Sequence, residues 1–144
     1  MRRAALLFIV ATALGQNATA PANQELLKSY LEKGTPFDFI LIDVRGSSEI
    51  TAAIGNARCK PYNFEWPVQF KAFSEKIPKD TAIFVYCQSG GRSARAAGFL
   101  AEGGFTRVYD AGGILTWTGS TIPSAEIKPA SLLPDPSMQA KEKQ

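Results

Sequence analysis

The hydrophobic residues of this chain fall alternately into strand-like runs and helix-like spacings. The clearest run, Thr81–Tyr86, is β-branched and aromatic with almost no charge, and it predicts a buried strand. Ser93–Glu102 follows it with small and apolar residues at helical spacing, and Gly103-Gly104 is expected to end that helix. The middle of the chain is therefore expected to hold one strand followed closely by one helix.

Weaker signals of the same two kinds extend across the rest of the chain. We expect a helix that Asn23 caps and Gly34 ends, and then a strand within Phe37–Val44 around the apolar run "FILI". The remaining expected elements are helical turns over Ser47–Ala53, a strand over Ala57–Lys60, a helix over Val68–Ile77, a strand over Arg107–Tyr109 and a last helix beginning in Ile114–Trp117. Strands that alternate with helices favour an α/β fold with a parallel sheet and helices on both faces.

The N-terminus predicts an export signal. Met1-Arg2-Arg3 is a short positive segment, and residues 4–14 form an apolar run that is too short to span a bilayer. Small residues follow, so we expect a signal peptide within residues 1–20, cleaved between 15 and 20. No cysteine lies at that junction to carry a lipid. The mature protein is expected to be exported without a stable membrane anchor, and to be periplasmic if its source is a Gram-negative bacterium.

Length and composition set the domain organisation. A chain of 144 residues suits one domain, and a hydrophobic fraction of 45% is sufficient for a core. We place that domain at residues 21–123 and expect the polar, proline-containing segment 124–144 to be a poorly ordered tail. The net charge of +3 gives no reason to expect a nucleic-acid partner, because two of the arginines behind it lie in the first three residues.

The absence of histidine restricts the chemistry that the chain can perform. Without an imidazole there is no Cys–His or Ser–His pair of the usual kind. Two cysteines and no histidine also provide too few ligands for a structural zinc site, so we expect no metal and no cofactor. A nucleophilic cysteine would have to be activated by some other group.

Cys87 stands directly after the clearest strand and shortly before the clearest helix. In a doubly wound sheet, ligands bind beyond the carboxyl ends of the strands, so this position suggests a site. The loop "QSGG" at 88–91 leaves backbone N–H groups uncovered, the next helix adds its positive N-terminal end, and Ser93 is placed to cap that helix. Such a cradle favours a thiolate without histidine, and it would hold an anionic substrate or a persulfide.

The second cysteine, Cys59, leaves alternatives open. Cys87 is alternatively a plain core residue, or it forms a disulfide with Cys59, as the cysteines of exported proteins often do. The glycine-rich context of Cys87 argues against both, since a structural cysteine has no use for an anion-binding loop. Cys59 itself is a buried strand residue, which is the interpretation that we favour, or a resolving thiol, or the disulfide partner of Cys87. The sequence does not rank the last two.

Four pieces of the chain combine into a specific pattern. They are "LIDVR" at 41–45, Glu49, "VYCQSGGRSARAAGFLAEGGF" at 85–105 and "DAGGILTW" at 110–117. In this order they resemble the single-domain rhodanese-like sulfurtransferases, here of an exported type. The resemblance implies an α/β domain with a five-stranded, mainly parallel sheet flanked by helices on both faces. It also implies that Cys87 is the nucleophile of a six-residue loop that ends at Arg92.

The resemblance further implies a sulfur transfer in two half-reactions. The Cys87 thiolate takes the sulfane sulfur of thiosulfate or a similar donor, and the resulting persulfide passes it to cyanide or to a thiol, such as that of a thioredoxin-like protein. The loop N–H groups would stabilise the persulfide anion. The expected site residues are Cys87 and Arg92 as catalytic residues, Gln88, Ser89, Gly90, Gly91, Ser93 and Arg45 around the substrate, and Asp43 as structural support. Arg92 either pairs with an oxyanion or holds the loop, and Arg45 is expected in an electropositive rim.

Three other functions stay open as alternatives. Phosphatases and arsenate reductases with a Cys-Arg loop need five residues between the cysteine and the arginine, whereas this loop has four. A non-catalytic binding module of the same fold is the second alternative, and thiol–disulfide exchange, which the absence of a C-x-x-C motif weakens, is the third. At 52–57 the chain has "AAIGNA" where the family often has "GHIPGA", and we do not expect the missing histidine to abolish activity.

Overall fold

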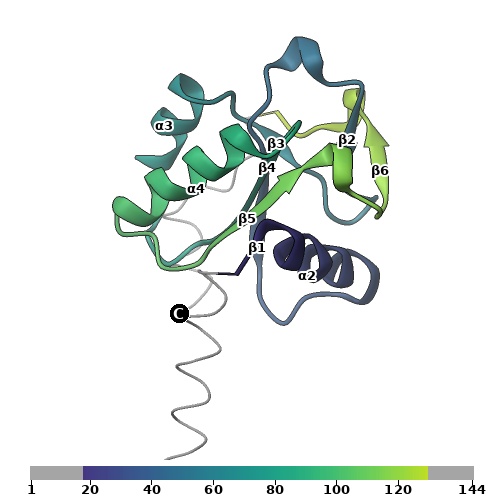
Figure 1. The fold of residues 1–144 in the computed structure, drawn as a ribbon, viewed down its shortest axis with the longest axis horizontal. Helices are drawn as coiled ribbons and strands as arrows, with labels where there is room; N and C mark the ends of the chain where they lie inside the picture. Colours follow the sequence, from purple (N-terminus) through teal and green to yellow (C-terminus); the bar gives the residue numbers. More distant parts are fainter. Residues whose placement is uncertain (1–17, 130–144) are drawn as a thin grey trace, which may run out of the picture.

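The computed structural model describes residues 18–129, and it shows a parallel sheet between two layers of helices (Figure 1). The sheet has four strands in the order β3-β1-β4-β5, and every neighbouring pair is parallel. The strands are β1 Phe39–Asp43, β3 Tyr62–Asn63, β4 Ala82–Cys87 and β5 Val108–Gly113. Because the strands run the same way, the carboxyl ends of β1 and β4 meet at one edge, where Asp43 lies opposite Tyr86.

Strand β4 lies inside the sheet, and all six of its residues are buried. Successive side chains of a strand point to opposite faces, so β4 contributes to two hydrophobic clusters. Ile83 and Val85 belong to the cluster on one face. Phe84 and Tyr86 belong to the cluster on the other, where the ring of Phe84 stacks on that of Tyr109 with centroids 4.6 Å apart. Burial on both faces explains why this segment is apolar throughout.

The helices supply the two outer layers. Helix α2, Ala20–Lys33, packs against one face, and helices α3, Val68–Ser74, and α4, Gly91–Glu102, lie on the other (Figure 1). Leu27 of α2 and Leu100 of α4 are fully buried at the two interfaces. Helix α3 forms within the segment that the apolar spacing predicted, and α4 begins two residues before its predicted start at Ser93.

Helix α2 begins earlier than the sequence indicated. Its cap is Thr19, whose hydroxyl oxygen accepts the N–H of Ala22 at 3.3 Å. Asn23, the expected cap, lies inside the helix, and its side chain donates to the carbonyl of Asp110 at 2.9 Å. The side chain of Asn23 thus joins the helix to β5 instead of starting the helix. Gly34 ends α2 as expected, with a positive φ of 93°.

The remaining strands form a small antiparallel ribbon in which β2, Ala52–Ile54, pairs with β6, Thr121–Pro123. The α/β class with a mainly parallel sheet is therefore confirmed, but the main sheet has four strands where five were expected. Three short 3-10 helices complete the described chain, namely η1 Ser47–Glu49, η2 Ile114–Thr116 and η3 Ser124–Glu126. The first falls where helical turns were expected, and the second is a single short turn where a last helix was expected to begin.

The strand expected over Ala57–Lys60 is a loop. The side-chain oxygen of Asn56 accepts the N–H groups of Arg58 at 2.9 Å and of Cys59 at 2.8 Å, which turns the backbone there. Strand β3 begins only at Tyr62. The prediction of a strand at Ala57–Lys60 was therefore wrong in position, because the strand of this part of the chain forms later.

The described residues extend slightly beyond both ends of the expected domain, 21–123. Helix α2 starts inside the segment assigned to a signal peptide, and residues 1–17 lie outside the described residues. Segment 124–129, expected in the tail, includes η3, and Lys128 donates its backbone N–H to the carbonyl of Pro61 at 2.9 Å. Residues 130–144 lie outside the described residues. Between 18 and 129, no helix is both long and apolar enough to cross a membrane.

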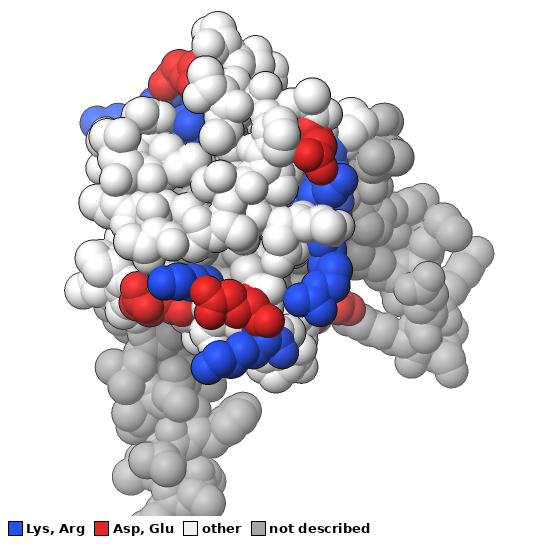
Figure 2. Space-filling model, turned by 90° about the vertical axis from the view of Figure 1, so that its right-hand side faces the viewer, with Lys and Arg blue, Asp and Glu red and all other residues white. Residues whose placement is uncertain are grey.

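Charged side chains are mixed in sign on the face drawn in Figure 2, where acidic groups lie next to basic ones. One ion pair, between Lys60 and Glu126 at 3.3 Å, joins the loop before β3 to η3. Both signs of charge are therefore present on this face.

We expect Phe84→Ala to lower the free energy of unfolding by about 3–5 kcal/mol, because the truncation leaves a cavity among packed aromatic rings. Phe84 is 0% exposed. Urea denaturation followed by circular dichroism measures the change. Val68→Ala is the control, since Val68 is 78% exposed and should change stability by less than about 0.5 kcal/mol. Equal losses in the two variants would contradict the packing described here.

Candidate active site

The sulfur of Cys87 lies at the start of helix α4 and accepts two backbone hydrogen bonds. Cys87 is the last residue of β4 and is 1% exposed. Its Sγ accepts the N–H of Gly90 at 3.0 Å and the N–H of Ser93 at 3.3 Å. Hydrogen bonds from N–H groups are strongest when the acceptor carries a negative charge. The two N–H groups are therefore placed to stabilise negative charge that develops on this sulfur.

Cys87 performs the role that a capping side chain has in other helices. The first N–H groups of a helix have no partner within it, and a Ser, Thr, Asp or Asn side chain usually accepts one of them. Here the cap position is occupied by Gly90, which has no side chain and a φ of 107°. The sulfur from the preceding strand end accepts the N–H of Ser93, the third residue of the helix. One sulfur atom thus accepts a hydrogen bond from the loop and another from the first turn of the helix.

Ser93 is in the site, but it does not cap the helix as expected. It lies in the first turn of α4, as the third residue of the helix, and it is 0% exposed. Its Oγ lies 3.1 Å from the carbonyl oxygen of Gly90 and 3.2 Å from that of Gly112. The hydroxyl therefore links the catalytic loop to β5, while its backbone N–H serves the sulfur.

Gly113 allows strand β5 to pass directly against the loop. A Cβ at this position would lie 2.7 Å from Cα of Ser89 and closer still to the carbonyl oxygen of Gln88. The same carbonyl accepts the N–H of Leu115 at 3.2 Å. Backbone thus packs on backbone here, which no side chain at 113 would permit. This contact explains the second glycine of "DAGGILTW", a role that the motif alone did not indicate.

Asp43 and Arg45 form a buried ion pair on the other side of Cys87. The side chains are 0% and 3% exposed, and Nη2 of Arg45 lies 2.7 Å from Oδ2 of Asp43. Arg45 also donates to Gln88 Oε1 at 3.1 Å and to the carbonyl of Ala52 at 2.8 Å. The guanidinium therefore connects β1, the catalytic loop and β2. It is an internal support and not part of the exposed electropositive rim that was expected.

Tyr86 lies next to the Asp43–Arg45 pair. Its hydroxyl accepts the N–H of Ile54 at 3.1 Å, and burial, with the charge of Asp43 adding to it, raises the pKa of Tyr86 well above its usual value. The phenol is therefore neutral and serves as a structural hydrogen-bonding group.

Arg92 is paired with Glu49, which lies at the end of η1. Its Nη1 and Nη2 each lie 2.7 Å from one carboxylate oxygen of Glu49, and the backbone N–H of Gly46 donates to the same carboxylate at 3.0 Å. The pKa of Glu49 is lowered to about 2. The hydrogen bond from Arg92 contributes most to this shift, and that from Gly46 contributes next. Glu49 is thus ionised at neutral pH, and the pair is lost only as the pH falls toward that value. No role had been assigned to Glu49 from the sequence.

Three of the expected backbone donors remain available to a ligand. Of the N–H groups of Ser89, Gly90, Gly91 and Arg92, only that of Gly90 contacts the sulfur. The other three donate to no protein acceptor among residues 18–129. Within the same range, no three Cys, Asp or Glu side chains are clustered in a way that could hold a metal ion.

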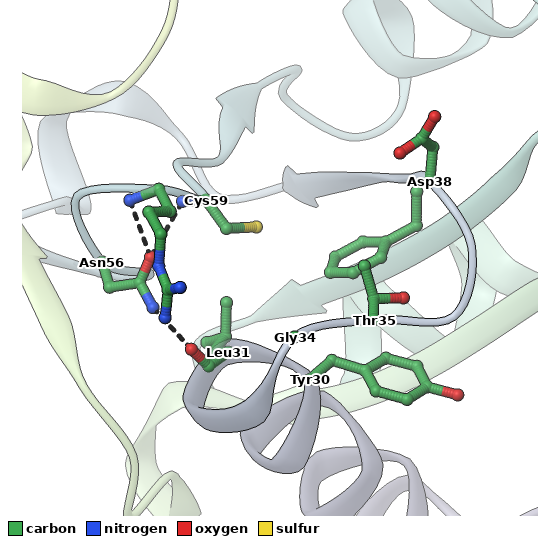
Figure 3. A pocket seen from close by; sticks show the side chains of 9 residues that line it. Tyr30, Leu31, Gly34, Thr35, Asp38, Asn56 and Cys59 are labelled. Carbon is green, nitrogen blue, oxygen red and sulfur yellow. Dashed lines mark hydrogen bonds between the residues drawn. The ribbon is translucent and has the colours of Figure 1, made fainter.

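Cys59 lies apart from this loop, beside a cavity of about 240 Å³ (Figure 3). The cavity is lined by Tyr30, Leu31, Gly34, Thr35, Asp38, Phe39, Asn56, Arg58 and Cys59. It adjoins the first residue of β1, whereas Cys87 ends β4, so the two cysteines are at opposite ends of parallel strands. Both thiols are free, and burial raises the pKa of Cys59, which keeps that thiol neutral. Cys59 is half-buried in a loop, not the strand residue that was expected.

The model of the rhodanese-like domain family matches residues 23–120. Together with the parallel sheet and the cysteine loop, this match shows that the chain belongs to the rhodanese-like family, as the sequence motifs suggested. Two curated relatives are similar to part of this chain. A sulfurtransferase of Allochromatium vinosum is 34% identical over 88 residues, which cover 60% of this chain and 78% of the relative. The protein YqhL of Bacillus subtilis is 37% identical over 81 residues, covering 55% and 60%.

Solved structures resemble the fold as well. The rhodanese-like domain of the Alr3790 protein from Anabaena sp. has a TM-score of 0.58 and 26% identity, and the match covers 74% of this chain and 82% of that one. The polysulfide-sulfur transferase homodimer from Wolinella succinogenes has a TM-score of 0.50 and 25% identity, covering 78% and 88%. The chain thus belongs to the rhodanese-like sulfurtransferase family, and its fold agrees with that family.

We expect Gly113→Ala to reduce sulfurtransferase activity by about 100-fold, because the new methyl group displaces the backbone of the catalytic loop. Gly98→Ala is the matched control. Gly98 lies in α4, where an added methyl group would meet nothing within 4 Å, so the change should leave activity intact and add about 0.5–1 kcal/mol of stability. Activity assays and thermal unfolding of both variants measure these effects. Full activity of Gly113→Ala would exclude the close packing of β5 on the loop.

We expect Asp43→Asn to lower the free energy of unfolding by about 3–5 kcal/mol, because it leaves the buried Arg45 cation without its counter-ion. Urea denaturation is the measurement. The exposed Asp80 provides the same chemical change without a buried partner, and Asp80→Asn should alter stability by less than about 0.5 kcal/mol. A similar small effect at Asp43 would mean that the ion pair does not support the site.

Proposed function

We propose that this protein transfers sulfane sulfur from thiosulfate, or a similar anionic donor, to cyanide or a thiol through a persulfide on Cys87. The observation that carries this proposal is the position of the Cys87 sulfur. It accepts two N–H groups at the start of α4, and three more N–H groups of the same loop are free to bind an added sulfur atom. The family match and the sulfurtransferase relative support the same reaction class.

In the first half-reaction, the Cys87 thiolate attacks the outer sulfur of the donor. A sulfur–sulfur bond forms at Cys87, the sulfur–sulfur bond of thiosulfate breaks, and sulfite leaves with the electron pair. The negative charge then lies on the outer sulfur of the persulfide. The loop N–H groups of Ser89, Gly91 and Arg92 would be donors for that charge, and the last two belong to the first turn of α4.

In the second half-reaction, a nucleophile attacks the outer sulfur. Cyanide becomes thiocyanate, or a thiolate becomes a persulfide, and the electron pair of the broken bond returns to the sulfur of Cys87. The hydrogen bonds from Gly90 and Ser93 stabilise this leaving thiolate, so the resting state is restored without a proton donor.

The biological donor and acceptor are part of the proposal. The name of the Wolinella structure supports polysulfide as a second anionic donor, because that protein shares the fold with this one. We propose a small thiol or a thioredoxin-like protein as the acceptor. We also propose that the protein acts after export, on the basis of its apolar N-terminal segment.

We expect Cys87→Ser to abolish both thiocyanate production from thiosulfate and cyanide and the uptake of one sulfur atom, because a serine hydroxyl cannot form the persulfide. Thiocyanate is followed by its colour with ferric ion, and sulfur uptake by intact-mass spectrometry after donor alone. Cys59→Ser is the control and should keep both properties, since Cys59 lies at the other end of the strands.

Two outcomes would contradict this assignment. If the reduced wild-type protein takes up no sulfur from thiosulfate or polysulfide, the sulfurtransferase reaction is excluded for these donors. If sulfur uptake is lost with Cys59→Ser and kept with Cys87→Ser, the persulfide forms on the other cysteine.

A further inference from the structure

Both arginines that were expected to bind an anionic donor are already paired with carboxylates. Arg45 is buried against Asp43. Arg92 is paired with Glu49 through two hydrogen bonds of 2.7 Å. The loop after Cys87 therefore offers backbone N–H groups to a donor, while the positive charges of Arg45 and Arg92 are neutralised.

The two pairs differ in how readily they can respond to a ligand. The side chains of Asp43 and Arg45 are almost fully buried, so separating them would leave unpaired charges in the interior. The side chains of Arg92 and Glu49 are 30% and 40% exposed. An exposed ion pair is weak, because water competes for both partners. Arg92 is therefore the cation that a donor can reach, and Glu49 is the group with which the donor competes.

Glu49 is held in place by more than the arginine. The backbone N–H of Gly46 donates to its carboxylate at 3.0 Å. That contact fixes the carboxylate within η1, so its negative charge stays close to Arg92 even when a donor arrives. Arg92 also belongs to the first turn of α4, next to the N–H groups that would bind the transferred sulfur.

We propose that Glu49 is a positioning residue that, by neutralising Arg92, lowers the advantage that the site gives to dianionic donors over monoanionic ones. This inference rests on the proposed function, since it concerns the donor of the same half-reaction. A dianion such as thiosulfate gains more from an unpaired guanidinium, and loses more from a fixed carboxylate, than a monoanion does. The Arg92–Glu49 pair therefore distinguishes donors by their charge more than by the reactivity of their sulfur.

Two donors of closely related chemistry separate charge from reactivity. Thiosulfate is a dianion, and methanethiosulfonate is a monoanion in which a methyl group replaces one oxygen. In each case the Cys87 thiolate forms a bond to the terminal sulfur and the donor's sulfur–sulfur bond breaks. Sulfite leaves with the electron pair from the first donor, and methanesulfinate leaves from the second. The enzyme product is the same persulfide, so its formation can be compared directly.

The test compares the wild type with Glu49→Gln, which keeps the size of the side chain and removes its charge. Persulfide formation is measured by stopping the reaction at short times and recording intact mass, over a range of concentrations of each donor. We expect the ratio of kcat/KM for thiosulfate to kcat/KM for methanethiosulfonate to rise about tenfold, which corresponds to about 1.4 kcal/mol. The change should appear mainly as a lower KM for thiosulfate, and raised salt should diminish it.

Glu102→Gln is the matched control, because it makes the same chemical change at the opposite end of α4. It should leave the donor ratio as in the wild type. A partly unfolded sample loses activity toward both donors in the same proportion. The ratio therefore reports the donor preference and not the amount of folded protein. Glu49→Ala, which also removes the carboxylate, is expected to move the ratio in the same direction.

The results separate this inference from the proposed function. If the wild type is loaded by neither donor, the proposed function fails. If the wild type is loaded, but the ratio in Glu49→Gln is unchanged or moves toward methanethiosulfonate, the role of Glu49 is overturned while the persulfide reaction stands. An equal rise in Glu102→Gln would also overturn it, because the effect would then follow from net charge alone.

Discussion

The structure of the site depends on one interaction, the pair of hydrogen bonds that the sulfur of Cys87 accepts from backbone N–H groups at the start of helix α4. The sulfur of Cys87 accepts the N–H groups of Gly90 and Ser93, and no side chain at the cap position competes with it. The contact that starts the helix is therefore also the contact that stabilises negative charge on sulfur. The same hydrogen bonds satisfy the helix end and stabilise the nucleophile. The chain can therefore stabilise negative charge on sulfur without a histidine.

The neighbouring strands hold this contact in place from both sides. On one side, Gly113 of β5 lies against the backbone of the loop, and Ser93 Oγ reaches the carbonyl of Gly112. On the other side, the buried Asp43–Arg45 pair extends from β1 to the side chain of Gln88. Each support comes from a strand that is hydrogen-bonded to β4. These strands thus hold the loop in place, while the partly exposed Arg92–Glu49 pair is the charged contact that a donor can reach.

Local sequence patterns predicted much of this arrangement. The apolar run before Cys87, the glycines after it and the helical spacing from Ser93 are all local signals, and they placed the nucleophile at a strand end before a helix. The errors arose where a distant partner decided the outcome. Ser93 was expected as a cap because its own position allows it, but sulfur takes that role. Arg45 was expected in a rim because arginine is usually exposed, but Asp43 permits its burial.

The sequence by itself determined the α/β class, the position of Cys87 and the need to activate it without an imidazole, because these follow from hydrophobic spacing, glycine placement and composition. Only the tertiary structure decided which groups serve the sulfur, why Gly113 must lack a side chain, and that Glu49 neutralises Arg92. These features join residues that are far apart in the chain, such as Glu49 and Arg92. Contacts of that kind depend on the relative placement of strands and helices, which local patterns do not encode.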